Sequence, residues 1–140
     1  MTSNDSTQPG DSAPAPLPPS PFAPQLFRGK RVFITGGGTG LGLEMSRRLA
    51  SLGAHVMIGS RNVDHHGAFL DEAKAEGWSA SAHVLDVRKL GDIADLVKEL
   101  TADGPVDMLV NNAAGNFVCP AERLSEGAWR AVLGIVLDGT

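Results

Sequence analysis

From Lys30 onward, short apolar runs alternate along the chain with segments whose apolar residues recur at helical spacing. The apolar runs are typical of buried strands, and they cover residues 32–34, 55–59, 82–85 and 108–110. Spacings of three and four residues predict helices near 41–52, 67–76 and 93–100, and another that begins near Ser125 or Glu126. In the first of these helices, the predicted core face consists of Leu41, Met45, Leu49 and Leu52.

Strands that alternate with helices of this length predict parallel pairing with right-handed crossovers. The predicted strands are apolar throughout, which is typical of a sheet covered on both faces. We therefore expect the N-terminal half of a doubly wound α/β sheet, a Rossmann fold, with strand order 3-2-1-4 over residues 28–140.

The first 27 residues have a different composition. Seven of the nine prolines lie between Pro9 and Pro24, and large apolar residues are few there. Such a segment cannot offset the entropy cost of ordering, so residues 1–27 are expected to form a disordered, proline-rich arm. A targeting peptide is the alternative, but the arm has neither an apolar core nor several arginines.

Composition narrows the class of protein. The net charge is −4, which argues against a nucleic-acid partner, and no apolar run approaches the roughly 18 residues of a membrane helix. Cys119 is the single cysteine, so an internal disulfide is excluded and a reducing compartment is expected, the cytoplasm or, in a eukaryote, the peroxisome or mitochondrion. We interpret Cys119 as a loop residue rather than a nucleophile. The pair His65-His66 has no accompanying ligand set, so we interpret both as surface residues and expect no metal site.

A glycine-rich turn follows the first predicted strand, with five glycines among residues 35–42. A turn at this place lets backbone approach a diphosphate, and the helix behind it offers free N–H groups. The spacing differs from G-x-G-x-x-G, and no Gly-Lys-Ser/Thr of a P-loop follows. The residues expected to bind a dinucleotide here are Thr35, Gly36, Gly38, Thr39, Gly40, Leu41 and Gly42.

The ends of the next two strands suggest which dinucleotide is bound. An NAD site favours an acidic residue after the second strand, whereas this chain has Arg61, whose guanidinium suits the 2′-phosphate of NADP(H). Asp86 ends the third strand at the expected adenine edge, where its carboxylate could accept from the adenine amino group. We therefore expect NADP(H) as the cofactor.

Thr35-Gly-x-x-x-Gly40-x-Gly42, Leu85-Asp86-Val87 and Asn111-Asn112-Ala113-Ala114-Gly115 occur here in that order. With them the chain resembles the short-chain dehydrogenase/reductase family over residues 30–140. The resemblance implies an NADP-dependent oxidoreductase with Asn112 and Ala113 among its cofactor-binding residues.

A narrower resemblance is to the NADPH-dependent 2,4-dienoyl-CoA reductases of auxiliary fatty-acid β-oxidation. It is carried by Asn116-Phe117 after Ala-Ala-Gly and by Val136, where other members of the larger family have Asn. The resemblance implies that Asn116 hydrogen-bonds the thioester carbonyl as the catalytic residue. It also implies that Arg88, Phe117 and Ser125 contact an acyl-CoA substrate, and that the parent protein is a homo-oligomer.

Members of this family also carry a Tyr-x-x-x-Lys pair on a later helix, and this chain contains no Tyr. We therefore expect residues 1–140 to be a fragment of a longer reductase and inactive by themselves. Three alternatives stay open: a relative that reduces another enoyl or carbonyl substrate, a non-catalytic NADP-binding module, and a truncation that does not fold. An in-frame Tyr-x-x-x-Lys beyond Thr140 would support the reductase.

Overall fold

The computed structural model describes residues 15–116 and 118–140, and it confirms the predicted alternation of strands and helices. In chain order the elements are β1 (Arg31–Thr35), α1 (Gly40–Ser51), β2 (His55–Ser60), α2 (Asp64–Glu76), β3 (Ala80–Val84), α3 (Leu90–Ala102), β4 (Met108–Asn111), the 3-10 turn η1 (Ala121–Arg123) and α4 (Glu126–Val136).

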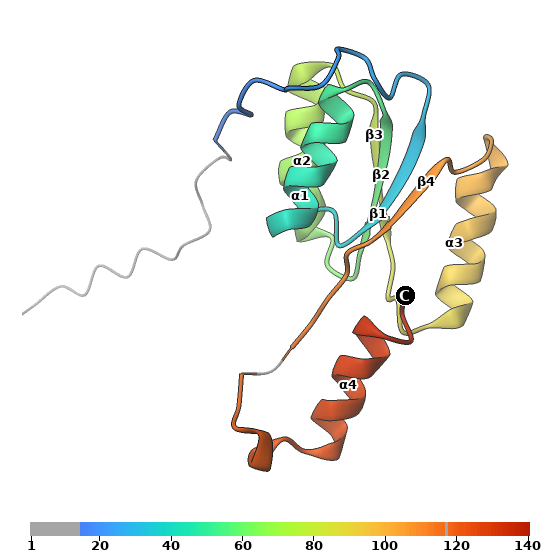
Figure 1. The fold of residues 1–140 in the computed structure, drawn as a ribbon. Coiled ribbons are helices and arrows are strands. Elements are labelled where there is room, and N and C mark those ends of the chain that lie inside the picture. Colours follow the sequence, from blue (N-terminus) through green and yellow to red (C-terminus); the bar gives the residue numbers. More distant parts are fainter. Residues whose placement is uncertain (1–14, 117) are drawn as a thin grey trace, which may run out of the picture.

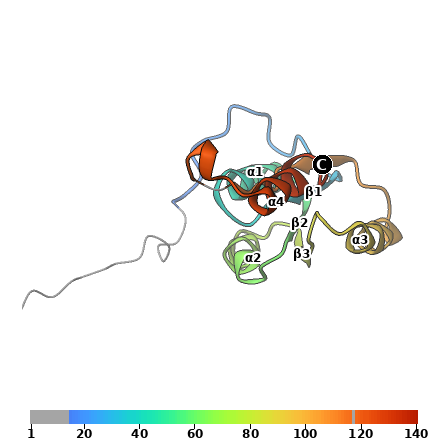
Figure 2. The same cartoon turned by 90° about the horizontal axis from the view of Figure 1, so that it is seen from below.

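The strands form one parallel sheet in the predicted order β3-β2-β1-β4. The central strand β1 pairs Val32 with Val56 of β2 and Phe33 with Leu109 of β4. Helices α1 and α2 cover one face of the sheet and α3 covers the other (Figures 1 and 2). The strand order therefore reverses at β1, with β2 and β3 on one side of it and β4 on the other. Doubly wound folds bind ligands at the carboxyl ends of the strands that flank such a reversal.

Side chains that alternate along β1 and β2 divide the core between the two faces of the sheet. On the α1 and α2 face, the buried cluster consists of Val32, Ile34, Ala50, Ala54, Val56, Ile58 and Phe69. On the α3 face, it consists of Phe33, Met57, Leu85, Val87, Leu96 and Leu100. Two-sided burial explains why β1 and β2 are apolar without alternation.

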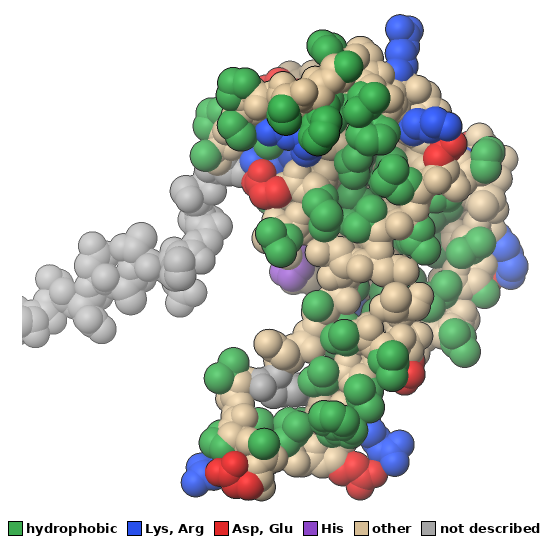
Figure 3. Space-filling view, in the orientation of Figure 1, with side chains coloured by type: hydrophobic (Ala, Val, Ile, Leu, Met, Phe, Trp, Pro, Cys, Tyr) green, Lys and Arg blue, Asp and Glu red, His purple; other side chains and the backbone are tan. Residues whose placement is uncertain are grey.

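Two-sided burial does not extend to β3 and β4, so that part of the expectation is wrong. Val84 of β3 is 64% exposed and Leu109 of β4 is 57% exposed, because these strands are the edges of the sheet. Helix α4 contributes no buried residue and lies beyond the carboxyl ends of the strands (Figure 1). Trp129 on this helix and Leu137 just after it have exposed apolar side chains. Apolar side chains are also visible in Figure 3 on the lower part of the molecule, where Figure 1 places α4.

The buried face of α1 also differs from the predicted one. Met45 and Leu49 pack against the core cluster and Leu52 is buried, as predicted. Leu41, in the first turn of α1, is 80% exposed instead. The deeply buried positions of α1 include Ser46 and Arg47, which are polar.

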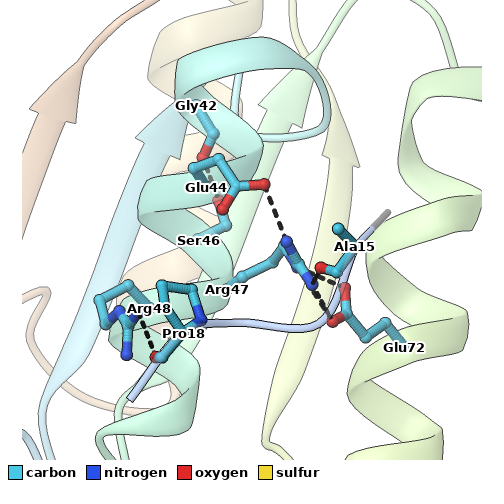
Figure 4. Close-up of polar contacts among 8 residues, drawn as sticks. All are labelled: Ala15, Pro18, Gly42, Glu44, Ser46, Arg47, Arg48 and Glu72. Carbon is cyan, nitrogen blue, oxygen red and sulfur yellow. Dashed lines mark hydrogen bonds and ion pairs between the residues drawn. The ribbon is translucent and has the colours of Figure 1, made fainter. Parts of the chain in front are cut away.

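The described part of the proline-rich arm, residues 15–27, leads to β1 (Figure 1), and its first residues, Ala15 and Pro18, lie beside α1 (Figure 4). The guanidinium of Arg47 donates to the carbonyl oxygen of Ala15 at 2.6 Å and binds the carboxylate of Glu72 on α2 at 2.7 Å. Arg48 donates to the carbonyl oxygen of Pro18 at 2.9 Å. These contacts order backbone that has little apolar surface of its own; residues 1–14 lie outside the described residues.

Candidate functional site

A pocket of about 380 Å³ lies at the carboxyl ends of the strands, beside the glycine turn. Its walls come from the turn and the start of α1, from the segments that follow β2 and β3, and from the segment after β4. The lining residues are Gly36, Thr39, Leu41, Gly42, Gly59, Ser60, Arg61, Asn62, His65, Leu85, Asp86, Val87, Asn112, Ala113, Ala114 and Ile135.

The glycine turn is compact because two of its residues cannot carry a side chain. Gly36 has a φ of +69°, and a Cβ there would lie 3.0 Å from the side-chain amide nitrogen of Asn112. A Cβ on Gly42 would overlap the carbonyl oxygen of Gly36 and lie 2.6 Å from the same amide nitrogen. These glycines therefore bring the first turn of α1, the end of β1 and the loop after β4 into contact.

Two buried hydroxyls hold this turn. Ser46 Oγ, completely buried, lies 2.9 Å from the carbonyl oxygens of both Gly37 and Gly42. Thr35 is 5% exposed, and its Oγ1 accepts hydrogen bonds from the backbone N–H groups of Asn112 and Ala113 at 3.0 and 2.9 Å. Thr35 thus supports the turn from below and is not one of the residues that line the pocket.

Helix α1 begins at the pocket with its N-terminus available to a ligand. Thr39, the N-cap residue, makes no side-chain capping hydrogen bond, and the first turn of α1 holds no acidic residue. Backbone N–H groups in such a first turn attract phosphate through their partial positive charge. The remaining predicted turn residues, Gly38 and Gly40, belong to the same turn without lining the pocket.

The pocket lining also includes charged residues that the sequence singled out. Arg61 and Asp86, which follow β2 and β3, both line the pocket. Arg88 donates to Asp86 through Nε at 2.8 Å and Nη2 at 2.6 Å, and these bonds lower the pKa of Asp86 to about 2. Arg61 forms no ion pair among residues 15–116 and 118–140, so its charge is available to an anion in the pocket.

The residues predicted to bind substrate are not gathered in the pocket. Asn116 is exposed and follows the last lining residue of its segment, Ala114. Ser125 caps α4, its Oγ accepting from the N–H of Ala128 at 3.2 Å, and Arg88 is paired with Asp86. Phe117 lies outside the described residues.

The arrangement fits a phosphorylated dinucleotide. Diphosphate would face the uncapped start of α1 at Thr39, and a phosphate monoester would face Arg61 across the pocket. The wall that contains Asp86 and Val87 could hold a base, although the Asp86 carboxylate shares its oxygens with Arg88. The residues present therefore suit the cofactor class that the sequence predicts.

Some pocket residues were missed by sequence reasoning. Ser60, Asn62 and His65 line the pocket beside Arg61, and their place directly after the second strand was the available signal. Ser46 was missed because nothing in the sequence separates a buried helical serine from an exposed one. His66 was interpreted as a surface residue, which is wrong, since it is 7% exposed.

Within the described ranges, no group of three or more His, Cys, Asp or Glu side chains could hold a metal ion. None of the described helices is long and apolar enough to cross a membrane.

Comparisons with known proteins agree with this geometry. A family model described as short chain dehydrogenase matches residues 30–140. "Probable 2,4-dienoyl-CoA reductase [(2E)-enoyl-CoA-producing]" of Bacillus subtilis (strain 168) is 47% identical over 116 residues, 79% of this chain and 44% of that protein. The chain therefore spans less than half the length of this relative.

Solved structures give the same result. The citronellol catabolism dehydrogenase of Pseudomonas aeruginosa PAO1 matches with a TM-score of 0.80 and 35% identity over 86% of this chain and 49% of that chain. The gluconate 5-dehydrogenase of Burkholderia cenocepacia J2315, in complex with NADP and tartrate, matches with a TM-score of 0.72 and 33% identity over 80% and 44%. With its parallel sheet, its glycine turn and a family match over residues 30–140, the chain belongs to the short-chain dehydrogenase family.

Proposed function

We propose that this chain forms the cofactor-binding part of an NADPH-dependent oxidoreductase that acts on 2,4-dienoyl-CoA thioesters. The observation that carries the cofactor assignment is Arg61, which has no ion-pair partner among the described residues and lines the same pocket as Thr39 at the uncapped start of α1. A guanidinium at this place favours a phosphate monoester over the free hydroxyl of NADH. The NADP complex of the Burkholderia structure supports the assignment.

Support for the substrate comes from the segment after β4. The 47% identity to the Bacillus protein named as a probable 2,4-dienoyl-CoA reductase favours a dienoyl thioester. Asn116 after Ala-Ala-Gly, together with Val136 in α4, is the pattern that resembles those reductases. Arg88, Phe117 and Ser125 are the proposed contacts to acyl-CoA, and Arg88 would exchange its bonds with Asp86 for a phosphate of the substrate.

The proposed chemistry asks one task of Asn116. Bound NADPH would supply a hydride to the conjugated acyl chain. Negative charge then develops on the thioester carbonyl oxygen, and the side-chain amide of Asn116 would donate a hydrogen bond to that oxygen. Asn116 is exposed on the segment between β4 and η1, where an incoming thioester could reach it.

Cofactor binding is tested on the 140-residue chain by isothermal titration with NADPH and NADH. We expect NADPH to bind at least about tenfold more tightly, in keeping with one charge-assisted hydrogen bond. Equal affinities would remove the proposed cofactor choice. Absence of binding by a chain with a cooperative unfolding transition would remove the binding role itself.

The substrate is tested by following NADPH oxidation with 2,4-hexadienoyl-CoA. The chain contains no Tyr for the expected catalytic pair, so we expect no turnover from the 140 residues alone. A chimera in which residues 30–140 replace the matching segment of the Bacillus relative should oxidise NADPH, and Asn116→Ala should reduce its kcat by about a hundredfold. A chimera active only with carbonyl substrates would favour another reductase of the family.

We also propose that the protein acts in the cytoplasm and that the parent protein is a homo-oligomer.

A further inference from the structure

A buried histidine lies behind the pocket wall that carries Arg61. His66, in the first turn of α2, is 7% exposed, whereas its neighbour His65 is exposed and lines the pocket. The Nε2 atom of His66 lies 2.9 Å from the Oγ of Ser60, the last residue of β2. The imidazole therefore bridges the end of β2 and the start of α2, and the loop with Arg61 lies between these two anchor points.

The direction of the hydrogen bonds follows from counting hydrogens. Ser60 Oγ donates its hydrogen to the carbonyl oxygen of Asn62 at 2.9 Å. A hydroxyl has a single hydrogen, so Nε2 of His66 has to be the donor to Ser60. Burial, and then the nearby His65 and His83, lower the pKa of His66, which favours the neutral ring near pH 7. Because Ser60 donates to Asn62, we assign the hydrogen of the neutral ring to Nε2. His66 Nε2 thus donates to the Ser60 hydroxyl, and the Ser60 hydroxyl donates to the carbonyl oxygen of Asn62.

Further bonds hold the backbone on both sides of Arg61. The carbonyl oxygen of Ser60 accepts from the N–H of Leu85 at 3.0 Å, which ties the end of β2 to the segment after β3. On the other side, Asn62 Oδ1 accepts from the N–H of Asp64 at 3.0 Å. The segment from Ser60 to Asp64 is thus a short closed loop. Arg61, which forms no ion pair among the described residues, lines the pocket together with Asn62.

The loop also meets the glycine turn. A Cβ on Gly38 would overlap the carbonyl oxygen of His65, so the first turn of α2 rests directly against the turn at the start of α1. A shift of the loop would therefore change the position of Arg61 relative to both the pocket and the helix N-terminus.

We propose that His66 is a positioning residue that sets the preference for NADPH over NADH by holding the Ser60–Asn62 turn through the Ser60 hydroxyl. This inference rests on the proposed function, because it takes Arg61 as the contact to the 2′-phosphate. We expect the effect to be largest for NADPH, because Arg61 would contact the 2′-phosphate that NADH lacks.

The test measures Kd values for NADPH and NADH on the 140-residue chain and its variants. His66→Leu removes the donor, and we expect NADPH to bind about tenfold more weakly while the Kd for NADH changes less than about twofold. His66→Gln keeps an N–H donor at nearly the same distance from the backbone, and it should restore NADPH binding to within about threefold. His55→Leu is the matched control, because His55 makes a similar bond to Ser79 Oγ at the opposite end of β2.

Ser60→Ala provides a second, independent variant in case His66→Leu does not fold. It should reproduce the selective loss, and a folded His66→Leu/Ser60→Ala double variant should lose no more than either single variant. Equal losses for NADPH and NADH, unchanged affinities, or no restoration by His66→Gln would overturn the proposal. So would a ¹⁵N NMR spectrum of the wild-type chain in which Nε2 of His66 carries no proton.

The proposed cofactor choice and the proposed role of His66 are distinguished by different results. If the wild-type chain binds NADPH and NADH equally, or if Arg61→Leu leaves the preference unchanged, the proposed cofactor choice fails and this inference fails with it. If Arg61→Leu abolishes the preference and His66→Leu does not change it, the inference about His66 alone is wrong.

Discussion

Asn112 donates two hydrogen bonds to Thr35 across 77 residues of sequence: its backbone N–H donates to the Thr35 Oγ1 at 3.0 Å, and its side-chain amide donates to the Thr35 carbonyl oxygen at 3.0 Å. The same amide donates to the carbonyl oxygen of Gly36 at 3.2 Å. The bonds join the ends of β1 and β4 at the point where the pocket opens. Because the glycine turn begins at Gly36, its position depends directly on this pair.

Thr35→Val should therefore destabilise the fold. Valine has nearly the shape of threonine but no acceptor, so the N–H groups of Asn112 and Ala113 lose their partner in a place largely closed to water. We expect the free energy of unfolding to fall by about 1–3 kcal/mol in urea titrations followed by circular dichroism. Thr35→Ser, which keeps the hydroxyl, serves as the control. A Thr35→Val variant as stable as wild type would show that the hydroxyl does not support the turn.

Gly42→Ala should damage the turn through a clash. The new methyl group would overlap the Gly36 carbonyl oxygen and press on the amide of Asn112. Overpacking of this kind is expected to cost about 1–3 kcal/mol of stability, measured as above, and to weaken NADPH binding. Gly67→Ala in α2 is the matched control, since its Cβ would meet nothing within 4 Å. There the better helix propensity of alanine should leave stability equal or higher. The same loss in both variants would contradict the steric explanation.

Arg61→Asp should invert the cofactor preference. The substitution replaces a cation that favours a 2′-phosphate with a carboxylate that repels it and can accept from the ribose hydroxyl. The ratio of the NADPH and NADH association constants should fall by at least about tenfold in isothermal titrations. Arg130→Asp provides the control, because Arg130 lies on α4 and pairs with Glu126 away from the pocket lining. An unchanged ratio for Arg61→Asp would refute the role given to Arg61.

The ion pair between Asp86 and Arg88 gives a pH signature. The pKa of Asp86 is lowered from 3.8 to about 2, chiefly by the side-chain hydrogen bond from Arg88, with Arg61 contributing least. Because the folded-state pKa lies below the unfolded one, the stabilisation is complete above pH 3.8 and is lost as pH falls toward 2. Arg88→Leu should raise the titration midpoint of the Asp86 carboxyl carbon, followed by ¹³C NMR, toward 3.8. Arg61→Leu should move it less, and equal shifts would contradict this ordering of causes.

Arg47→Met should loosen the proline-rich arm. The buried guanidinium of Arg47 binds Glu72 and Glu44 and holds the carbonyl oxygen of Ala15, and methionine can fill the space without making these bonds (Figure 4). We expect a loss of about 1–3 kcal/mol, because Glu72 keeps some access to water. Chymotrypsin should also cleave faster after Phe22.

Arg48→Met is the matched control for the arm, since it removes a single exposed bond to Pro18 and should have a smaller effect. If neither variant alters the cleavage rate, the two arginines do not hold the arm. If both accelerate it equally, the buried position of Arg47 has no special importance.

Local patterns in the sequence were sufficient for the fold and for much of the site. Apolar runs and helical spacing predicted four parallel strands in the order that the structure has, because periodicity reflects which faces an element buries. The position of the glycine turn and of Arg61 and Asp86 placed them at one pocket, since parallel strands bring their carboxyl ends to one edge. These features depend on the order of strands, helices and motifs along the chain, which can be read directly from the sequence.

The tertiary structure decided what depends on distant contacts. The exposure of β3 and β4 follows from their place at the sheet edges, and the path of residues 15–27 follows from two arginines on α1. Likewise, the burial of His66 and its bond to Ser60, and the hydrogen bonds from Asn112 to Thr35, require residues from different elements to meet. Such bonds depend on distances of about 3 Å between atoms that sequence spacing does not define. The sequence by itself therefore determined where the pocket lies, and packing determined which residues hold its walls.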